Sequence, residues 1–345
     1  MHIKWNDVAT ESFNVTNGVG QGGILSPFLF GIYIDELLRK LRASGIGCHM
    51  GHYYAGALGF ADDLILLCPS LYGIRRMLEI CENFAAEYDL IFNGAKSKLL
   101  IFDKENMVEN DPKLKLNGEL IPNVESADHL GNILHVKNNQ ECIDAGIRKF
   151  NSQVNMFLAR FKTCTPSIRN ELFQQYCSSL YGCQLWPLWS KKMVGVTTKW
   201  CIAMRRVWSI SWRTHRDLLP LISGMQPIEL SIQSRILKFV KSLHNSENDL
   251  VKYIVKYATT AKSSILGRNV RILCTRTNKS HEDILKLTEP KMKKIIYEKW
   301  NEKINNGYTT RANVIKKLLL AKENIWLEKV DRIASDTVID ILCVL

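Results

Sequence analysis

The segment that most constrains the fold is residues 58–67, LGFADDLILL, in which two adjacent aspartates interrupt an apolar run. Apolar residues stand on both sides of Asp62 and Asp63, so the pattern predicts a short strand, a turn and a second short strand. The simplest interpretation is structural, because aspartate is common in tight turns, where its side chain bonds the local backbone. The apolar flanks, however, also predict buried surroundings for the turn.

A buried acidic pair is unfavourable, because the two carboxylates repel each other and lose their hydration. A divalent cation removes both penalties. Mg²⁺ takes oxygen ligands and usually shares them with substrate phosphates. Two such ions can activate an attacking oxygen and stabilise a leaving one in phosphoryl transfer. Asp62 and Asp63 are therefore candidate ligands of Mg²⁺ (or Mn²⁺), alongside the turn interpretation.

The rest of the chain changes character near residue 140, from mixed strands and helices to helices. Ser26-Pro27 predicts a helix start, with Ser26 as the cap, and the apolar residues that follow predict a helix packed in a core. The expected elements are two short strands within 3–15 around Asn6-Asp7, helices at 27–41 and 73–88, a strand at 98–102, a hairpin around Asn117-Gly118 and several helices from residue 143. This order predicts an α+β fold.

Charge and cysteine content restrict the class of protein. The chain has 46 Lys and Arg against 34 Asp and Glu, a net charge of +12, which favours a polyanionic partner such as nucleic acid or a membrane surface. The ten cysteines form no C-x-x-C pair and are typical of a reduced compartment. No run of 18 apolar residues occurs, so no membrane span is expected.

Four stretches, in order, resemble the palm of reverse transcriptases, and more narrowly those of non-LTR retrotransposons. They are GVGQGGILSPFLFGIYIDELL at 18–38, Phe60-Ala61-Asp62-Asp63, LIFNGAKSKLLIF at 90–102 and HLGNIL at 129–134. The acidic motif alone is weak, whereas the four together are specific. The resemblance implies a partial right-hand polymerase palm over 1–135, a helical thumb-like region over 136–220 and a helical basic carboxy-terminal region over 221–345.

The resemblance also implies roles for single residues. Asp62 would be a ligand shared by both metal ions, and Asp63 a weaker or indirect one. Lys96 would contact the triphosphate or protonate the leaving pyrophosphate, with a solvated loop lysine as the alternative. Leu130 and Gly131 would steady the primer strand, or form a strand-to-helix bend. The implied contacts to template and incoming nucleotide are Gln21, Gly22, Gly23, Phe60, Ala61 and Asn93.

Some of these positions have simpler interpretations. Without the resemblance, Gln21, Gly22 and Gly23 would belong to a flexible loop, and Asn93 would shape its own turn. Asp35 lies in the helix behind the loop and is interpreted as solvated. The family usually has a basic residue where Gly20 stands, so one phosphate or template contact is expected to be lost.

The implied activity is RNA-directed DNA polymerisation, with RNA template, DNA primer and deoxynucleoside triphosphate as partners. The family carries fingers and a further palm aspartate upstream of its glycine-glutamine loop, whereas here 20 residues precede Gln21 and Asp7 is the sole aspartate among them. The chain is therefore expected to be weakly active or inactive alone, with a missing amino-terminal half as a possible partner. The alternatives are a non-catalytic nucleic-acid-binding remnant and a fragment that folds poorly. The expected location is intracellular, cytoplasmic or, by resemblance, nuclear.

A second candidate for nucleic-acid binding lies in the helical part. Residues 191–216 hold seven Lys or Arg and no acid, interleaved with Trp200, Trp208 and Trp212. Basic groups suit phosphates and aromatic rings suit bases. The alternative is an amphipathic helix with tryptophans in the core, which the spacing of Trp208 and Trp212 favours. Residues 262–279 are also basic and free of acids.

Overall fold

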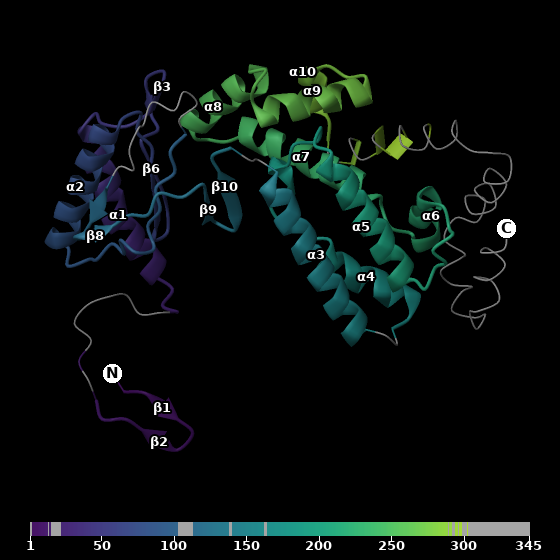
Figure 1. Cartoon of the computed structure of the whole chain (residues 1–345), viewed down its shortest axis with the longest axis horizontal. Coiled ribbons are helices and arrows are strands. Elements are labelled where there is room, and N and C mark those ends of the chain that lie inside the picture. Colours follow the sequence, from purple (N-terminus) through teal and green to yellow (C-terminus); the bar gives the residue numbers. More distant parts are fainter. Residues whose placement is uncertain are drawn as a thin grey trace. The chain divides into compact units, whose positions relative to one another are not determined.

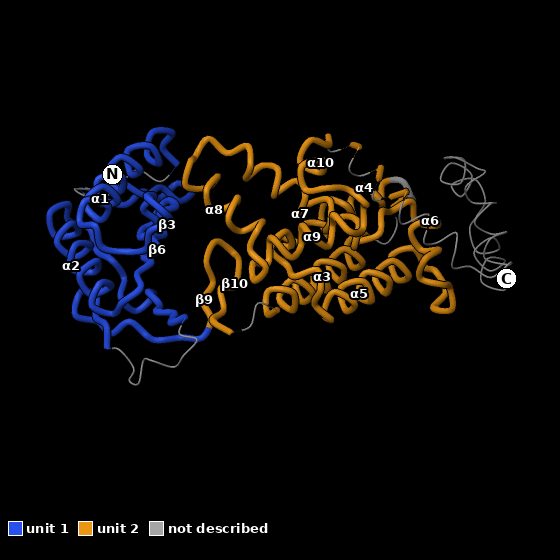
Figure 2. Tube along the Cα trace, turned by 90° about the horizontal axis from the view of Figure 1, so that it is seen from above, with its two compact units in different colours: residues 1–125 blue, residues 126–345 orange. Residues whose placement is uncertain are grey.

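The computed structural model describes residues 2–12, 14, 22–102, 113–137, 140–161, 164–288 and seven further residues between 290 and 302. The chain divides into two compact units, residues 1–125 and residues 126–345 (Figure 2). Helices combined with short antiparallel strands confirm the α+β class. The three regions expected from the sequence, with boundaries near residues 135 and 220, stay a prediction.

Unit 1 contains two helices and four antiparallel strand pairs within its described residues (Figure 1). Its elements are β1 (Lys4–Trp5), β2 (Val8–Ala9), α1 (Ser26–Ala43), β3 (His49–Met50), β4 (Tyr53–Tyr54), β5 (Ala57–Phe60), β6 (Asp63–Leu66), α2 (Leu71–Glu87), β7 (Lys115–Leu116) and β8 (Glu119–Leu120). Consecutive strands pair through tight turns. Asn117 and Gly118 both adopt positive φ, at 51° and 79°, as the predicted two-residue hairpin turn requires.

The core of unit 1 lies between α1 and α2. The amphipathic pattern over 73–88 correctly predicted α2, whose Met77 and Phe84 are buried against Leu37 and Leu41 of α1. Ser70 caps α2 by accepting a hydrogen bond from the Gly73 backbone N–H at 3.1 Å. The apolar residues of the β5–β6 hairpin cover the same cluster, so α1 and the hairpin are fixed against each other.

Three expectations for the elements of unit 1 were wrong. The first turns of α1 are not in a core: Phe28 is 72% exposed and Ile32 is 68% exposed, because only the second half of α1 packs on α2. Its N-cap is Leu25, with no side-chain cap, so Ser26 does not have the predicted capping role. The predicted strand at 98–102 reduces to one bridge between Leu99 and Asn123.

Unit 2 begins with a β-hairpin and continues as helices. Its elements are β9 (Ser126–His129), β10 (Asn132–His135), α3 (Glu141–Arg160), α4 (Pro166–Cys177), η1 (Cys183–Leu185), α5 (Lys192–Val207), η2 (Arg216–Leu218), α6 (Leu219–Ser223), α7 (Ile228–His244), α8 (Asp249–Thr260), α9 (Ile265–Thr277) and α10 (His281–Lys286). One continuous apolar cluster runs through α3, α4, α5, α7 and α9. Trp186, 1% exposed, is the largest side chain fully buried in it.

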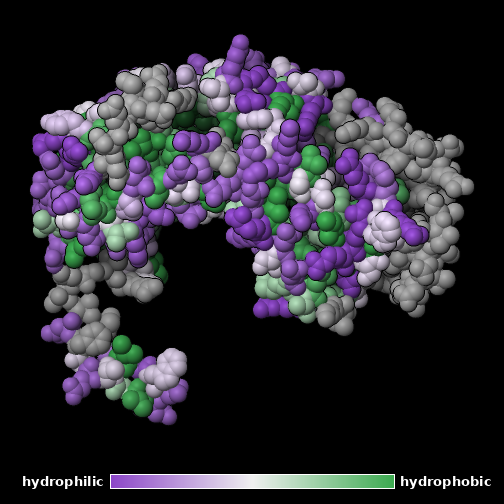
Figure 3. Space-filling model, viewed as in Figure 1, coloured by the Kyte–Doolittle hydropathy of each residue, from purple (hydrophilic) through white to green (hydrophobic). Residues whose placement is uncertain are grey.

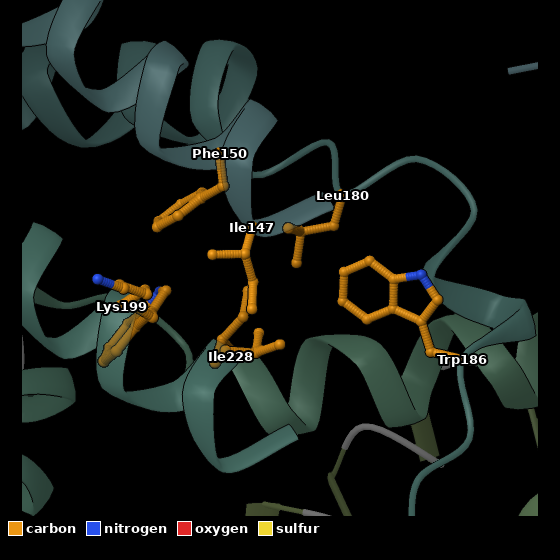
Figure 4. A pocket seen from close by; sticks show the side chains of 8 residues that line it. Ile147, Phe150, Leu180, Trp186, Lys199 and Ile228 are labelled. Carbon is orange, nitrogen blue, oxygen red and sulfur yellow. The ribbon is translucent and has the colours of Figure 1, made fainter. Parts of the chain in front are cut away.

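Unit 2 has a small, partly open apolar cavity of about 10 Å³ against its core. Figure 4 shows side chains from separate segments, among them Ile147, Leu180 and Trp186, around this cavity. Its volume is near that of one water molecule, but an apolar lining offers a water few polar partners. We therefore interpret it as an ordinary packing void.

Two polar side chains connect distant segments of unit 2. Asn269 on α9 is fully buried, accepts a hydrogen bond from the Leu188 N–H at 2.9 Å and donates one to the Trp186 carbonyl oxygen at 2.8 Å. Arg235 on α7 donates to the carbonyl oxygen of Ser178 at 2.5 Å and to that of Ser179, directly after α4. Asn269 thereby satisfies backbone groups in the core, and Arg235 bonds carbonyl oxygens that have no partner within the end of α4.

Figure 3 shows hydrophobic residues reaching the surface as separate patches between hydrophilic ones. Among the helices that the structure describes, none has the length and apolar content needed to cross a membrane.

Candidate functional site

The acidic pair lies at the tip of the β5–β6 hairpin, as predicted. The strands pair in the register Phe60↔Asp63 and Leu58↔Ile65, which leaves Ala61 and Asp62 as the two turn residues. Ala61 has φ 52°, a left-handed conformation that glycine or asparagine adopts more readily than alanine. The tip therefore holds a residue in an unfavourable conformation at the candidate catalytic position.

The two faces of the hairpin differ. A Cβ on Gly59 would lie 3.4 Å from Leu38 Cδ1, so this face packs closely on α1. Leu64 and Leu66 contact the same core. The opposite face, formed by the alternate residues, is open: Phe60 is 63% exposed and Leu58 is 43% exposed. The hairpin is thus a supported platform with an apolar outer face beside the acids.

The predicted burial of the acidic pair was wrong, because Asp62 and Asp63 are both exposed. The apolar residues around them come from the strands and not from a cover over the tip. Within the part of the chain that the structure describes, neither carboxylate forms an ion pair or a side-chain hydrogen bond. Their oxygens are accessible to an external cation, but desolvation no longer argues that a cation must be present.

The donor set fits Mg²⁺ only in part. Mg²⁺ is commonly held by one or two carboxylates, with waters and substrate phosphates completing its octahedron. Asp62 and Asp63 supply two such carboxylates. Among the described residues, no group of three or more His, Cys, Asp or Glu side chains could enclose a metal ion. A further ligand would have to come from a substrate, from water or from a protein segment outside the described residues.

The loop at 93–97 is shaped by Asn93. Its side-chain Oδ1 accepts a hydrogen bond from the Lys96 N–H at 2.9 Å, and its carbonyl oxygen accepts from the Ser97 hydroxyl at 2.8 Å. Gly94 is buried, and a Cβ there would lie 2.8 Å from the Leu116 carbonyl oxygen. Asn93 therefore has the turn-forming role given as the alternative. Lys96 is exposed, and its predicted contact with a triphosphate stays a prediction.

The glycine loop before α1 is described only in part. Gln21 lies outside the described residues. Gly22 has φ 86°, and no atom lies within 4 Å of the position that a Cβ would take. Glycine therefore suits this position because of the positive φ and not because another group packs closely against it. The Gly23 carbonyl oxygen accepts a hydrogen bond from the Ser26 N–H at 3.2 Å, at the start of α1.

Leu130 and Gly131 form the turn of the β9–β10 hairpin, which belongs to unit 2. The alternative of a strand-to-helix bend was wrong: both residues have positive φ, 48° and 71°, between paired strands. Tyr181 donates its hydroxyl hydrogen to the Leu130 carbonyl oxygen at 2.9 Å. Sequence reasoning missed Tyr181, because it lies 51 residues away and no local pattern marks it. A contact of this turn with a primer stays a prediction.

The two other aspartates considered as ligands have ordinary surroundings. Asp35 forms an exposed ion pair with Arg39 at 2.6 Å, one helical turn away, which confirms its interpretation as solvated. Asp7 is exposed in the turn between β1 and β2. Neither belongs to a metal-sized cluster among the described residues.

The tryptophans of 191–216 fall into two groups. Trp200 is 3% exposed and Trp208 packs against the core of unit 2, as the amphipathic interpretation predicts. Trp212 differs from that interpretation: it is 77% exposed, with the Arg213 guanidinium 5.3 Å from its ring centroid. The α5 helix ends at Val207, so the helical spacing used to place Trp212 does not extend that far.

Comparisons with known proteins match parts of the chain. Residues 2–134 match the family model described as "Reverse transcriptase (RNA-dependent DNA polymerase)". Over 88 residues the chain is 38% identical to the "Retrovirus-related Pol polyprotein from type-2 retrotransposable element R2DM" of Drosophila melanogaster, an alignment covering 26% of this chain and 8% of that protein.

Two further relatives give the same picture. The chain is 33% identical over 117 residues to the "Retrovirus-related Pol polyprotein from type-1 retrotransposable element R2" of Popillia japonica, covering 33% of this chain and 16% of that one. It is 28% identical over 130 residues to the "Putative 115 kDa protein in type-1 retrotransposable element R1DM" of Drosophila melanogaster, covering 35% and 11%. The matched stretch is thus a small part of each relative.

Proposed function

Residues 2–134 of the chain belong to the reverse transcriptase family of non-LTR retrotransposons, and from that premise we propose that they form part of the palm of an RNA-directed DNA polymerase. The helices of unit 2 would then include its thumb. The reaction would be attack by a primer 3′-hydroxyl on the α-phosphorus of a deoxynucleoside triphosphate, with release of pyrophosphate.

The observation that carries the proposal is the tip of the β5–β6 hairpin. It presents two exposed carboxylates, which form no ion pair with any described residue, on a strand pair that is packed against α1. When bound, Mg²⁺ would polarise the reacting phosphoryl group and lower the pKa of the attacking hydroxyl. Asp62 and Asp63 would hold it, and the rigid hairpin would keep their oxygens in a fixed position.

Three further positions would contact the substrates. The ring of Phe60, opposite Asp63 in the register and 63% exposed, offers a flat apolar surface for a sugar or base. The exposed ammonium of Lys96 would attract the triphosphate or protonate the pyrophosphate. The turn at Leu130, held by the Tyr181 hydroxyl at 2.9 Å, would contact the primer.

We further propose that the chain alone is weakly active. Two carboxylates match the one or two that Mg²⁺ commonly takes, but no described residue completes a cluster of three that would hold the ion without substrate. A metal ion stabilises the transition state by several kcal/mol, so loose binding would reduce the rate by orders of magnitude. A polypeptide that supplied a further carboxylate beside the hairpin would restore activity.

The direct test is extension of a DNA primer on an RNA template by the purified chain, with Mg²⁺ or Mn²⁺ and all four deoxynucleoside triphosphates. Asp62→Asn removes one ligand charge with little change of shape, and Asp35→Asn is the matched control on an exposed aspartate of α1. We expect extension, even if slow, to be lost in Asp62→Asn and kept in Asp35→Asn.

A second readout does not require turnover. Bound Mn²⁺, followed by electron paramagnetic resonance, should decrease in Asp62→Asn and stay unchanged in Asp35→Asn. If extension and Mn²⁺ binding are both insensitive to Asp62→Asn, the hairpin is not a metal site.

The second candidate function is non-catalytic nucleic-acid binding. The net charge of +12 favours it. Binding of primer-template that is salt-dependent and unchanged by Asp62→Asn, together with no extension and no Mn²⁺ binding, would support this candidate over the polymerase.

A further inference from the structure

The helices α8 and α9 pack against each other, and their segment carries almost only positive charge. Between Asp249 and Glu282 the chain has seven Lys or Arg residues and no Asp or Glu, which gives this segment +7 of a net +12 for the whole chain. All seven basic residues are exposed. They are Lys252, Lys256, Lys262, Arg268, Arg271, Arg276 and Lys279.

Few of these charges are neutralised within the protein. Among the described residues, Lys252 alone of the seven forms an ion pair, with Asp249 at 2.7 Å. Arg271 instead donates to the carbonyl oxygens of Ala261 and Lys262, at 3.3 and 3.2 Å, and so orders the loop between the two helices. The remaining cations are available to an external anion.

Aromatic rings accompany the charges. Tyr257 on α8 is 62% exposed and Tyr253, one turn earlier, is 41% exposed, so both rings lie on the same side of the helix. Lys256 adjoins Tyr257 in the sequence and is exposed with it. Exposed rings beside basic groups are typical of surfaces that bind single-stranded nucleic acid.

A third ring is held beside α9. The Arg268 guanidinium lies 3.7 Å from the ring centroid of Trp189, which remains 36% exposed. The buried Asn269, next to Arg268, bonds the backbone of Trp186 and Leu188. The Trp189 loop and α9 are therefore fixed to each other before any ligand arrives, which reduces the entropy lost on binding.

We propose that the α8–α9 hairpin, residues 249–279 with Trp189, is a binding surface for single-stranded nucleic acid. The exposed lysines and arginines would lie along the phosphates, and Tyr253, Tyr257 and Trp189 would stack on bases. Charge complementarity and exposed rings together favour a strand with accessible bases over a duplex. The surface lies outside residues 2–134 and does not depend on metal binding at the acidic hairpin.

The test is binding of a labelled single-stranded RNA to the full chain over a range of salt concentrations. A triple variant, Lys256→Gln, Lys262→Gln and Arg276→Gln, removes three charges of the hairpin. Each lost phosphate contact should reduce the slope of log K against log salt by about 0.7, so we expect a decrease of about 2. The matched control, Lys4→Gln, Arg39→Gln and Arg75→Gln, removes three exposed charges of unit 1.

The stacking component has its own variants. Tyr257→Ala should weaken binding of the single strand by roughly tenfold, and Tyr257→Phe should keep it, because the ring and not the hydroxyl stacks. Tyr72→Ala, which removes a tyrosine of α2 that is 73% exposed, is the control. All sites are exposed, and unchanged circular dichroism would show that each variant folds.

The ligands offered in parallel are single-stranded RNA, single-stranded DNA, duplex DNA and vesicles containing anionic lipid. Selective loss of RNA or DNA strand binding in the hairpin variants supports the proposal and identifies the strand. Equal loss of binding in the two triple variants would show that binding depends only on net charge, and would overturn the proposal. Vesicle binding without strand binding, or no loss in either hairpin variant, would also overturn it.

Discussion

Replacing Asn269 by leucine tests whether one buried amide holds α9 to the loop at 186–190. The two side chains have the same number and branching of heavy atoms, so no cavity forms. The change leaves the Leu188 N–H and the Trp186 carbonyl oxygen, now bonded at 2.9 and 2.8 Å, without partners in the core. Each buried group left unsatisfied costs about 1–3 kcal/mol, so the expected loss for the two groups is about 2–6 kcal/mol.

The assay is urea unfolding followed by tryptophan fluorescence. Seven of the eight tryptophans lie in residues 126–345, so the signal reports mainly on unit 2. We expect Asn269→Leu to lower the midpoint with an unchanged m-value. Asn245→Leu, at the exposed end of α7, should stay within about 0.5 kcal/mol. A loss below about 0.5 kcal/mol for Asn269→Leu would refute the reasoning.

Three further predictions concern packing, pH and a turn. A Cβ at Gly146 would lie 2.8 Å from Cη2 of the buried Trp186 ring, so Gly146→Ala should destabilise unit 2 by about 1–3 kcal/mol in the same urea assay. Burial, and then the neighbouring His281, lower the pKa of His244 from 6.5. On acidification the unfolded chain therefore takes up a proton on this histidine at a higher pH than the folded chain does. The stability contributed by neutral His244 should be fully present above pH 6.5 and fall below it. In thermal melts recorded over a pH series, His244→Phe should reduce this loss of stability below pH 6.5. Leu130 has φ 48°, and Leu130→Asn should raise the thermal midpoint by relieving about 0.5–1 kcal/mol, whereas an unchanged or lower midpoint would contradict this.

Local patterns predicted the elements whose stability is local. The helix over 73–88 and the hairpin at Asn117-Gly118 were found because periodicity and turn chemistry act over a few residues. The acidic hairpin was placed correctly for the same reason. Its burial was not, because apolar neighbours in a sequence do not reveal which face of a two-stranded sheet has a partner.

Non-local contacts explain the remaining differences. The apolar start of α1 was predicted to lie in a core, yet burial depends on what packs against a helix, and α2 covers only its second half. Among the described residues, the strand expected near residue 98 finds a partner only at Asn123, through the Leu99 bridge. Tyr181, which bonds the Leu130 turn, could not be found from its own surroundings.

The guanidinium of Arg235 has a consequence for how the sequence of unit 2 tolerates change. Arg235 lies 57 residues downstream of Ser178, and its side chain donates hydrogen bonds to the carbonyl oxygens of Ser178 and Ser179 at the end of α4. The end of α4 therefore depends on the side chain of a residue in α7 and not on a glycine at its own C-terminus. In a saturation mutagenesis scan, Ser178 and Ser179 should accept most residues, whereas Arg235 should accept few. A prediction from local sequence alone would place the constraint on the end of α4 in α4 itself, whereas the structure places it at Arg235 of α7.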